Sequence, residues 1–315
     1  MEWKSGDFTL IHEEKWGMDL PSYEDHEWGM RKIVDIGVDP FDRVYLLTRS
    51  SRPIIVTDGE GRYLTHWNNT EFKRPHSISF TEEGCIYIVD DDCHCVTKYD
   101  INGKMIYRLG DPDNPAETGC VHKDYRTVRY SAGPFCYPTG VSITEDGEIY
   151  VSDGYGNARI HRFDATGGLI QSWGEPGVLP GQFFLPHGVY VREDTVFVAD
   201  RENNRVQLFD REGTFKEEWP GFIRPTAIRY DPRGFLYVTE AKRCDVFDAV
   251  PSALCIVSLE GKRLAEFDNR RGCYLGATYH TAHGLGMGNA GEIYIGEVGA
   301  PPEDFLGVKK YWVNC

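Results

Sequence analysis

The sequence lacks the long apolar runs and the excess of positive charge that would connect it to a membrane or to nucleic acid. No run approaches the roughly 18 apolar residues of a membrane span, and the first residues contain no apolar core of a signal peptide. Lysine and arginine number 34 against 49 aspartates and glutamates, which gives a net charge of −15. Nucleic-acid backbones and anionic membranes both require clustered cations. We therefore expect neither as a partner, although a local basic pocket would still suit a small anion.

The cysteines lack a pattern of their own. There are nine, an odd number, which without a secretory signal is typical of reduced thiols and predicts a cytoplasmic protein. Cys93-His94-Cys95 has the look of a metal site, but no second cysteine pair follows at zinc-ribbon spacing. We interpret these three as residues of a strand.

What the sequence does contain is one pattern repeated six times. Each copy has an apolar triplet, a turn that often contains Asp-Gly or Glu-Gly, an apolar strand closed in most copies by an acidic residue, and a further strand. Several short strands in each repeat of roughly 40 residues are typical of a propeller, whose closure leaves few exposed sheet edges. We predict an all-β fold, a single six-bladed β-propeller domain over residues 1–315, in which residues 8–11 complete the last blade beside residues 311–313.

The repeats differ in length because of two insertions, 110–135 and 241–252. Both follow strands whose ends are expected near the mouth of the central axis, so both are candidates for walls or a lid. Within the first insertion, residues 122–130 mix aromatic side chains with cations. This stretch is the strongest candidate for a lid.

Aligning the repeats reveals histidine in every second copy. The residue after the opening proline, or its equivalent, is in turn Val34, His76, Thr139, His187, Thr226 and His283. Alternate blades of a six-fold ring are 120° apart, so three imidazoles at one depth would converge on the axis. Three protein ligands with an open fourth position are what catalytic zinc requires, and imidazole also suits other divalent metals. We predict a metal site made of His76, His187 and His283, with zinc as the preferred ion.

The ends of the second strands supply candidates for substrate binding and catalysis. Arg49 and Arg201 stand one residue beyond this end in the first and fourth repeats, and Tyr155 stands two residues beyond it in the third. An arginine there can bind a substrate carboxylate through its forked donors, and a phenol can act as a base. The alternatives are ion pairs between blades for the arginines and packing for Tyr155.

The sequence also resembles a known family. The runs 153–160, 186–189 and 198–206 resemble the lyase domain of peptidylglycine α-amidating enzymes, a six-bladed NHL-type propeller with a catalytic zinc. The resemblance implies zinc on His76, His187 and His283, Tyr155 as the catalytic base, and Arg49 and Arg201 as ligands of the substrate carboxylate. The implied reaction cleaves the C–N bond of an N-acyl-α-hydroxyglycine to an amide and glyoxylate.

The chain departs from the family at two positions beside the third histidine. The family holds a structural calcium with two backbone carbonyls, here those of Ile36 and Ile78, and with an acidic residue that is Gly284 in this chain. The glycine argues against calcium. A methionine of the family is replaced by Thr281. Both departures lie in the segment of the third histidine, and the lack of a signal peptide fits poorly with the processing of neuropeptides, so we expect a smaller carbinolamide-type substrate.

Two alternative functions stay open. One is a propeller lyase or hydrolase that acts on another small molecule, although lactonases of this fold use Glu, Asn and Asp on the axis rather than three histidines. The other is a non-catalytic NHL-repeat scaffold, which would need no axial histidines. The sequence carries no signal for an oligomeric state.

Overall fold

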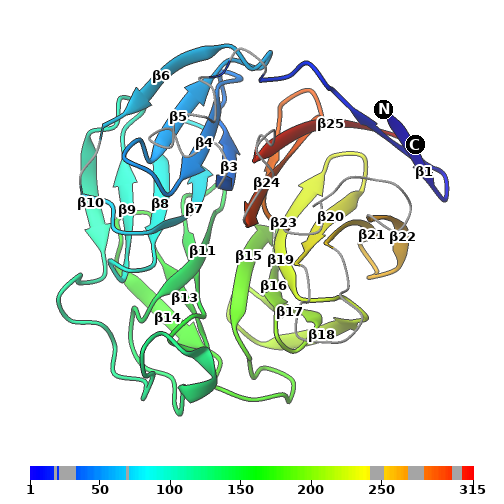
Figure 1. The fold of residues 1–315 in the computed structure, drawn as a ribbon. Coiled ribbons are helices and arrows are strands. Elements are labelled where there is room, and N and C mark those ends of the chain that lie inside the picture. The colour runs from blue at the N-terminus through cyan, green and yellow to red at the C-terminus, as the bar shows by residue number, and fades with distance from the viewer. Residues whose placement is uncertain (18–19, 21–32, 69–70, 242–251, 269–279, 300–306) are drawn as a thin grey trace. The chain divides into compact units, whose positions relative to one another are not determined.

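The computed structural model describes residues 1–315 except 18–19, 21–32, 69–70, 242–251, 269–279 and 300–306. The described residues form two compact units. The first unit combines residues 1–70 with 226–315, and the second consists of residues 71–225. Each unit contains three antiparallel sheets (Figure 1).

The second unit is built of three four-stranded sheets that follow one another along the chain. Their strands are β7 (Pro75–Phe80), β8 (Ile86–Asp90), β9 (Cys95–Tyr99) and β10 (Met105–Leu109); β11 (Pro138–Ile143), β12 (Ile149–Asp153), β13 (Arg159–Phe163) and β14 (Leu169–Trp173); and β15 (Pro186–Arg192), β16 (Thr195–Asp200), β17 (Arg205–Asp210) and β18 (Phe215–Pro220). In each sheet the second strand is fully or almost fully buried, whereas the fourth is largely exposed. The fourth strand is therefore the outer edge of its sheet.

The first unit contains the other three sheets. They are β3 (Ile33–Val38), β4 (Val44–Thr48), β5 (Ile54–Thr57) and β6 (Tyr63–Trp67); β19 (Pro225–Asp231), β20 (Phe235–Glu240), β21 (Ala253–Ser258) and β22 (Arg263–Asp268); and β23 (His280–Met287), β24 (Ile293–Gly299) and β25 (Val308–Asn314), extended by β2 (Phe8–His12) and β1 (Glu2–Ser5). Leu10 pairs with Val313 across β2 and β25. The prediction that the N-terminal strand completes the last blade is confirmed.

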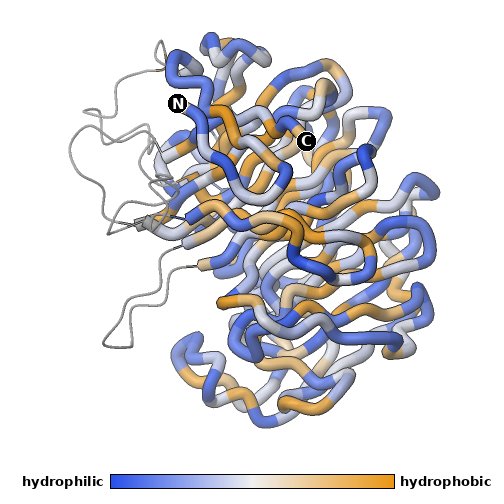
Figure 2. Tube along the Cα trace, turned by 90° about the vertical axis from the view of Figure 1, so that its right-hand side faces the viewer, coloured by the Kyte–Doolittle hydropathy of each residue, from blue (hydrophilic) through white to orange (hydrophobic). Residues whose placement is uncertain are grey.

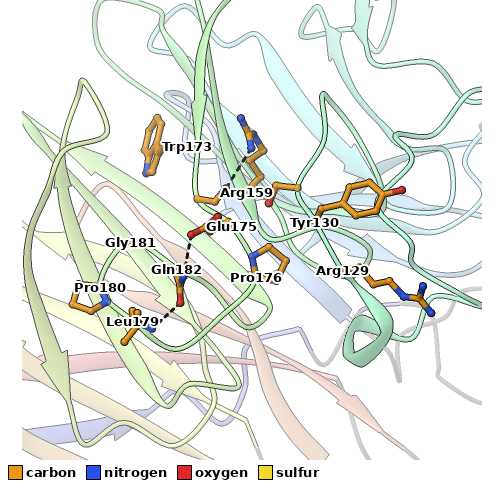
Figure 3. A pocket seen from close by; sticks show the side chains of 12 residues that line it. Arg129, Tyr130, Arg159, Trp173, Glu175, Pro176, Leu179, Pro180, Gly181 and Gln182 are labelled. Carbon is orange, nitrogen blue, oxygen red and sulfur yellow. Dashed lines mark hydrogen bonds between the residues drawn. The ribbon is translucent and has the colours of Figure 1, made fainter.

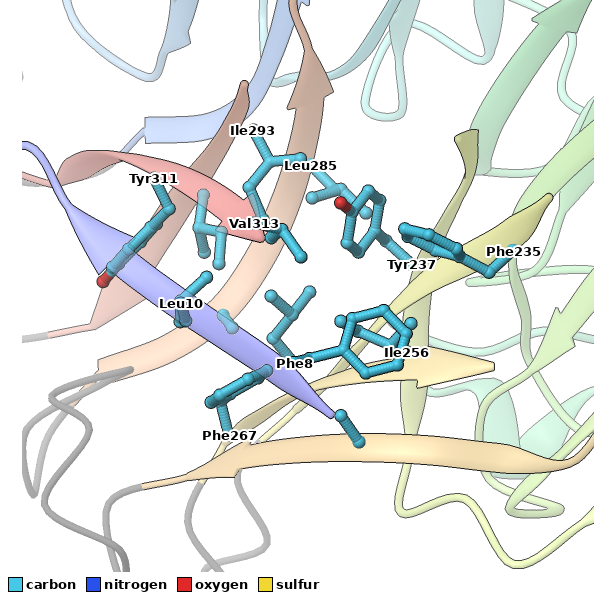
Figure 4. Close-up of a cluster of buried hydrophobic side chains, with 14 of the residues drawn as sticks. Phe8, Leu10, Phe235, Tyr237, Ile256, Phe267, Leu285, Ile293, Tyr311 and Val313 are labelled. Carbon is cyan, nitrogen blue, oxygen red and sulfur yellow. The ribbon is translucent and has the colours of Figure 1, made fainter. Parts of the chain in front are cut away.

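The core of the first unit explains why the two ends of the chain share one sheet. Phe8 and Leu10 of β2 pack among Tyr237, Phe267 and Tyr311, all of them buried (Figure 4). Burial of such large side chains contributes on the order of 2 kcal/mol each. Along the trace, apolar residues concentrate in the strands and polar residues in the turns that join them (Figure 2).

The predicted all-β, six-bladed β-propeller is confirmed by these six antiparallel sheets. Among the described residues, the one helical element is the short 3-10 helix η1 (Tyr125–Thr127). In that part of the chain no helix is long and apolar enough to span a membrane. The single domain over 1–315 stays a prediction, and all but the two ends of the 241–252 insertion lie outside the described residues.

Candidate metal and catalytic centre

The three histidines at the aligned position of alternate repeats are His76, His187 and His283, and they will be called the register histidines. Each lies at a β-bulge in the strand that opens its repeat. In the β7–β8 pair, Pro75 is opposite Asp90 but Ser77 is opposite Val89, so His76 is the extra residue of the bulge. The same shift occurs at four other register positions, namely Val34, Thr139, His187 and His283. A bulge bends its strand and re-aims the side chain of the extra residue. The bulges therefore give these positions an equivalent local geometry.

Buried carboxylates hold the loops that lead into the bulges. The side chain of Asp90 accepts hydrogen bonds from the backbone N–H groups of Lys73 (2.7 Å) and Arg74 (2.9 Å). Asp200 accepts one from Phe184 N–H (2.8 Å). These acids at the ends of the second strands thus have a structural role, since they fix the loops directly before Pro75 and Pro186.

Within the second unit, His76, His187 and Tyr155 come together. The Tyr155 hydroxyl lies 3.0 Å from His76 Nε2 and 3.3 Å from His187 Nε2. The two imidazole rings are 5.0 Å apart between centroids. Tyr155 is placed by its backbone N–H, which bonds to the Tyr137 carbonyl (3.2 Å), and by Gly154, where any Cβ would lie 2.1 Å from the Pro186 carbonyl oxygen.

The second ring nitrogen of two histidines is used in the same way. His76 Nδ1 lies 2.6 Å from the carbonyl oxygen of Thr139, and His283 Nδ1 lies 2.7 Å from that of Val34. A carbonyl oxygen only accepts hydrogen bonds, so each Nδ1 carries the proton and each Nε2 presents a lone pair. Metal-binding histidines are commonly oriented by such a bond from the other ring nitrogen.

The donor set suits a metal ion. His76, His187 and His283 are buried, with 1%, 3% and 8% of their surface exposed, and this group of three imidazoles could bind a metal. His76 and His187 belong to the second unit and His283 to the first. Neutral imidazole favours zinc and other borderline metals over calcium or magnesium.

Three cations face the ring of Tyr155. Arg201 Cζ is 5.9 Å from the ring centroid, Arg74 Cζ is 5.7 Å and Lys123 Nζ is 5.4 Å. Arg201 is the one of these that the sequence singles out, and its Nε donates to Glu202 (2.9 Å). The predicted Arg49 lies in the first unit, directly after β4, and its role stays a prediction.

Lys123 and Arg74 are brought to Tyr155 by contacts that the repeat pattern does not encode. Lys123 Nζ donates to Asp91 (2.7 Å) and to Asp92 (2.6 Å), and Arg74 also donates to Asp91. Burial raises the pKa of Asp91 to about 6, and it outweighs the opposing effect of the two cations. The only sequence signal for Lys123 is its place in the aromatic and cationic stretch of the first insertion.

That insertion lies against Tyr155. The Thr118 hydroxyl donates to the carbonyl of Gly156 (2.5 Å), and η1 begins at a turn in which Asp124 accepts from Arg126 N–H (3.0 Å). Residues 118–130 will be called the strap. The predicted lid stretch, 122–130, belongs to this strap.

Beside the third histidine, the space next to Gly284 is filled by another residue. A Cβ at position 284 would lie 2.4 Å from Asp35 Cα and 2.9 Å from the carboxylate oxygen Asp35 Oδ1. The position that is acidic in the calcium-binding pattern therefore has no room for a side chain here. An acidic group is nevertheless present, since Asp35 is buried there and its Oδ1 accepts from Ile36 N–H (3.0 Å).

Two hollows lie on the second unit near the strap. The larger, about 670 Å³, is lined by Arg159, Trp173 and Gln182 among others, and Gln182 bonds Glu175 within it (Figure 3). The smaller, about 300 Å³, is lined by apolar side chains of the strap and of the loop before β15. None of the predicted site residues lines either hollow.

Comparisons with known proteins place these features in context. The NHL repeat model matches residues 135–163 and 185–209, the segments that carry Tyr155, His187 and Arg201. The probable peptidyl-alpha-hydroxyglycine alpha-amidating lyase pgal-1 of Caenorhabditis elegans is 32% identical over 65% of this chain and 53% of its own length. Peptidyl-alpha-hydroxyglycine alpha-amidating lyase 1 of Drosophila melanogaster is 30% identical over 54% of this chain and 32% of its own length.

The matched segments thus span about half or less of these curated relatives. Among solved structures, one titled "Streptogramin B lyase structure" aligns with a TM-score of 0.59 and 14% identity over 99% of this chain and 98% of the other. At that identity the likeness concerns the fold alone. The resemblance to α-amidating lyases is confirmed by the named relatives and by the NHL repeats.

Proposed function

We propose that this chain, a relative of peptidyl-alpha-hydroxyglycine alpha-amidating lyases, is a metal-dependent carbon–nitrogen lyase that cleaves N-acyl-α-hydroxyglycines or similar carboxylate-bearing carbinolamides. The names of the relatives support a lyase function in general. The observation that carries the finer proposal is the Tyr155 hydroxyl, held 3.0 and 3.3 Å from the Nε2 atoms of His76 and His187. A phenol held this close to two imidazole nitrogens is placed to take part in proton transfer.

His76, His187 and His283 would hold the metal, with zinc as the preferred ion. When bound, such an ion would act as a Lewis acid and lower the pKa of a coordinated hydroxyl group. The fit rests on the burial of the three imidazoles and on the Nδ1 bonds of His76 and His283, which leave Nε2 as the donor atom.

The protein's own residues account for the other parts of the reaction. Arg201 binds the substrate carboxylate through its guanidinium group, and Arg49 is proposed to assist it. Tyr155 acts as the base in its phenolate form and accepts the proton of the carbinol hydroxyl; the C–O bond becomes a carbonyl as the C–N bond breaks. The proton passes to the departing amide nitrogen. The products are an amide and glyoxylate, so no oxidant and no water are consumed.

A glyoxylate-release assay tests the proposal. Zinc-loaded protein is expected to release glyoxylate and benzamide from α-hydroxyhippurate in equal amounts. Tyr155→Phe, which keeps the ring but removes the hydroxyl, should lower kcat by about 10²–10⁴-fold, the usual range for loss of a general acid–base group. Tyr130→Phe is the matched control, because Tyr130 is an exposed tyrosine at the end of the strap, and its activity should equal that of the wild type. Full activity in Tyr155→Phe would refute the assignment of the base.

A further inference from the structure

The smaller hollow of the second unit has the composition of a binding pocket for an apolar group. Its volume is about 300 Å³, and its walls come from the strap and from the loop before β15. The apolar side chains that line it include Tyr125, Val128, Val178, Phe183, Phe184 and Leu185, and its polar side chains are those of Arg126 and Asn157. Small-molecule sites are typically such mostly apolar hollows with a few polar groups at one end.

The pocket adjoins the segment that carries Arg201. The carbonyl of Leu185 accepts from Arg201 N–H (3.1 Å), and the carbonyl of Phe184 accepts from Glu202 N–H (3.0 Å). Leu185 is two residues from His187, and Asn157, which also lines the pocket, is two residues from Tyr155. One wall of the pocket is therefore tied directly to the proposed catalytic segment.

The strap supplies the other wall. The ring of Tyr125 packs edge-on against Phe184, with 5.3 Å between the ring centroids. Burial raises the pKa of Tyr125, the charge of Glu202 raises it further, and the charge of Arg201 opposes this. Phe184, which packs against Tyr125, also bonds to Glu202 next to Arg201, so both walls of the pocket adjoin the segment of Arg201.

We propose that this pocket binds the acyl group of the substrate, and that it selects small apolar acyl groups, such as one aromatic ring, over charged or peptide-sized ones. The inference rests on the proposed function. In an N-acyl-α-hydroxyglycine, the acyl carbon is only three bonds from the carboxyl carbon, so a carboxylate on Arg201 leaves the acyl group beside the pocket. The volume suits this class, since a cavity of roughly 150 Å³ is enough to hold benzene.

Two neighbouring residues offer a matched pair of variants. Val178 lines the smaller pocket and Leu179 lines the larger hollow, and their side chains are 68% and 62% exposed. Both carbonyls accept from Arg205 (2.9 and 3.0 Å), so the two backbones are held alike. Val178→Trp should narrow the pocket, and Leu179→Trp should add the same bulk outside it.

The first measurement is the ratio of kcat/KM for α-hydroxyhippurate to that for N-acetyl-α-hydroxyglycine. We expect the wild type to prefer the benzoyl substrate by about tenfold or more, as one extra apolar group in a fitted pocket usually brings. Val178→Trp should lower this preference about tenfold, whereas Leu179→Trp should change it less than about twofold. An unchanged preference in Val178→Trp overturns the pocket while leaving the lyase function intact.

The second measurement is binding of benzamide to the zinc-loaded protein by calorimetry, which requires no turnover. Benzamide should bind to the wild type and to Leu179→Trp, and about tenfold more weakly to Val178→Trp. If the wild type releases no glyoxylate but shows this binding pattern, the proposed function is wrong while the binding of an apolar group in the pocket is supported. Absence of benzamide binding, or equal binding to all three proteins, overturns the pocket.

Discussion

Two networks of charged side chains lie beside Tyr155, and they differ in the ion pairs that they form. In the first, the guanidinium groups of Arg201 and Arg224 share the single carboxylate of Glu202. Its ion pairs join two guanidinium groups to one carboxylate. The guanidinium group of Arg201 can bind a carboxylate ligand through its forked donors.

In the second network the charges cancel. Lys123 and Arg74 meet two carboxylates, those of Asp91 and Asp92. A balanced set has little to gain from a substrate anion, but it can fasten the strap to the turn after β8. We therefore propose substrate binding for the first network and placement of the strap for the second.

The largest effect is expected from the first network. Arg201→Ala should lower kcat/KM for α-hydroxyhippurate by about 10- to 150-fold, because hydrogen bonds to charged groups contribute about 1.5–3 kcal/mol. The loss should appear mainly in KM, since the carboxylate is bound in the ground state and in the transition state alike. Arg201→Lys, which keeps the charge but not the fork, should recover part of it. If Arg201→Ala has the KM of the wild type, the carboxylate binds elsewhere.

The second expected effect concerns stability and pH. The pKa of Asp91 is raised to about 6 from its ordinary value of 3.8, so the folded state holds this proton more tightly than the unfolded state. Its contribution to stability is fully present below about pH 4 and is lost as the pH rises through 6, at most about 3 kcal/mol. Asp91→Asn cannot lose a proton there. Urea unfolding at pH 4 and pH 7 should therefore show that the free energy of unfolding of the variant, relative to that of the wild type, is higher at pH 7 than at pH 4.

Asp92→Asn is the control for this measurement, because the hydrogen bond and charge of Lys123 lower the pKa of Asp92 and outweigh the desolvation that would raise it. A lowered pKa has the opposite sign, so the Asp92 variant should lose stability relative to the wild type at pH 7. Two variants with the same pH dependence would mean that the charges of this network are not distributed as described.

The smallest expected effect is local. Lys123→Met removes two charge-assisted hydrogen bonds from the strap, and tryptic cleavage after Arg126 should become about tenfold faster, as a loss of about 1.4 kcal/mol in local stability would produce. Lys123→Arg should cleave there at nearly the wild-type rate, because it keeps the donors. Mass spectrometry of the early fragments measures cleavage of the peptide bond after Arg126 separately from cleavage at other sites. Equal cleavage of all three proteins would show that Lys123 does not fasten the strap.

Much of the candidate site could be predicted because its residues occupy equivalent positions of the repeats. The register of Val34, His76, Thr139, His187 and His283 is visible as the residue after each opening proline or its equivalent, and the same alignment leads to Tyr155 and Arg201. What a repeat cannot display is the β-bulge at each of these positions, because a bulge exists only in the pairing of two strands. The reason that equivalent positions are re-aimed alike became visible only in the pairing registers.

The residues that sequence reasoning missed belong to contacts without a repeat. The side chain of Lys123 donates to Asp91, which lies 32 positions earlier in the chain. The backbone reverses at this point, because His122 and Lys123 both have a positive φ. Neither is glycine, so the sequence gives no sign of the reversal.

The prediction of a strand over Cys93, His94 and Cys95 was wrong at its start. Cys93 and His94 lie in a turn, and β9 begins only at Cys95.

The central claim is that the register histidines hold one metal ion. Its most direct test is the zinc content of the purified protein after dialysis against a weak chelator, for the wild type, His187→Ala and His66→Ala. The account predicts one zinc per chain in the wild type and in His66→Ala, whose histidine lies on the outer strand β6, and almost none in His187→Ala. A wild type without bound zinc or another divalent metal, or a His187→Ala variant that keeps its full complement, would contradict it.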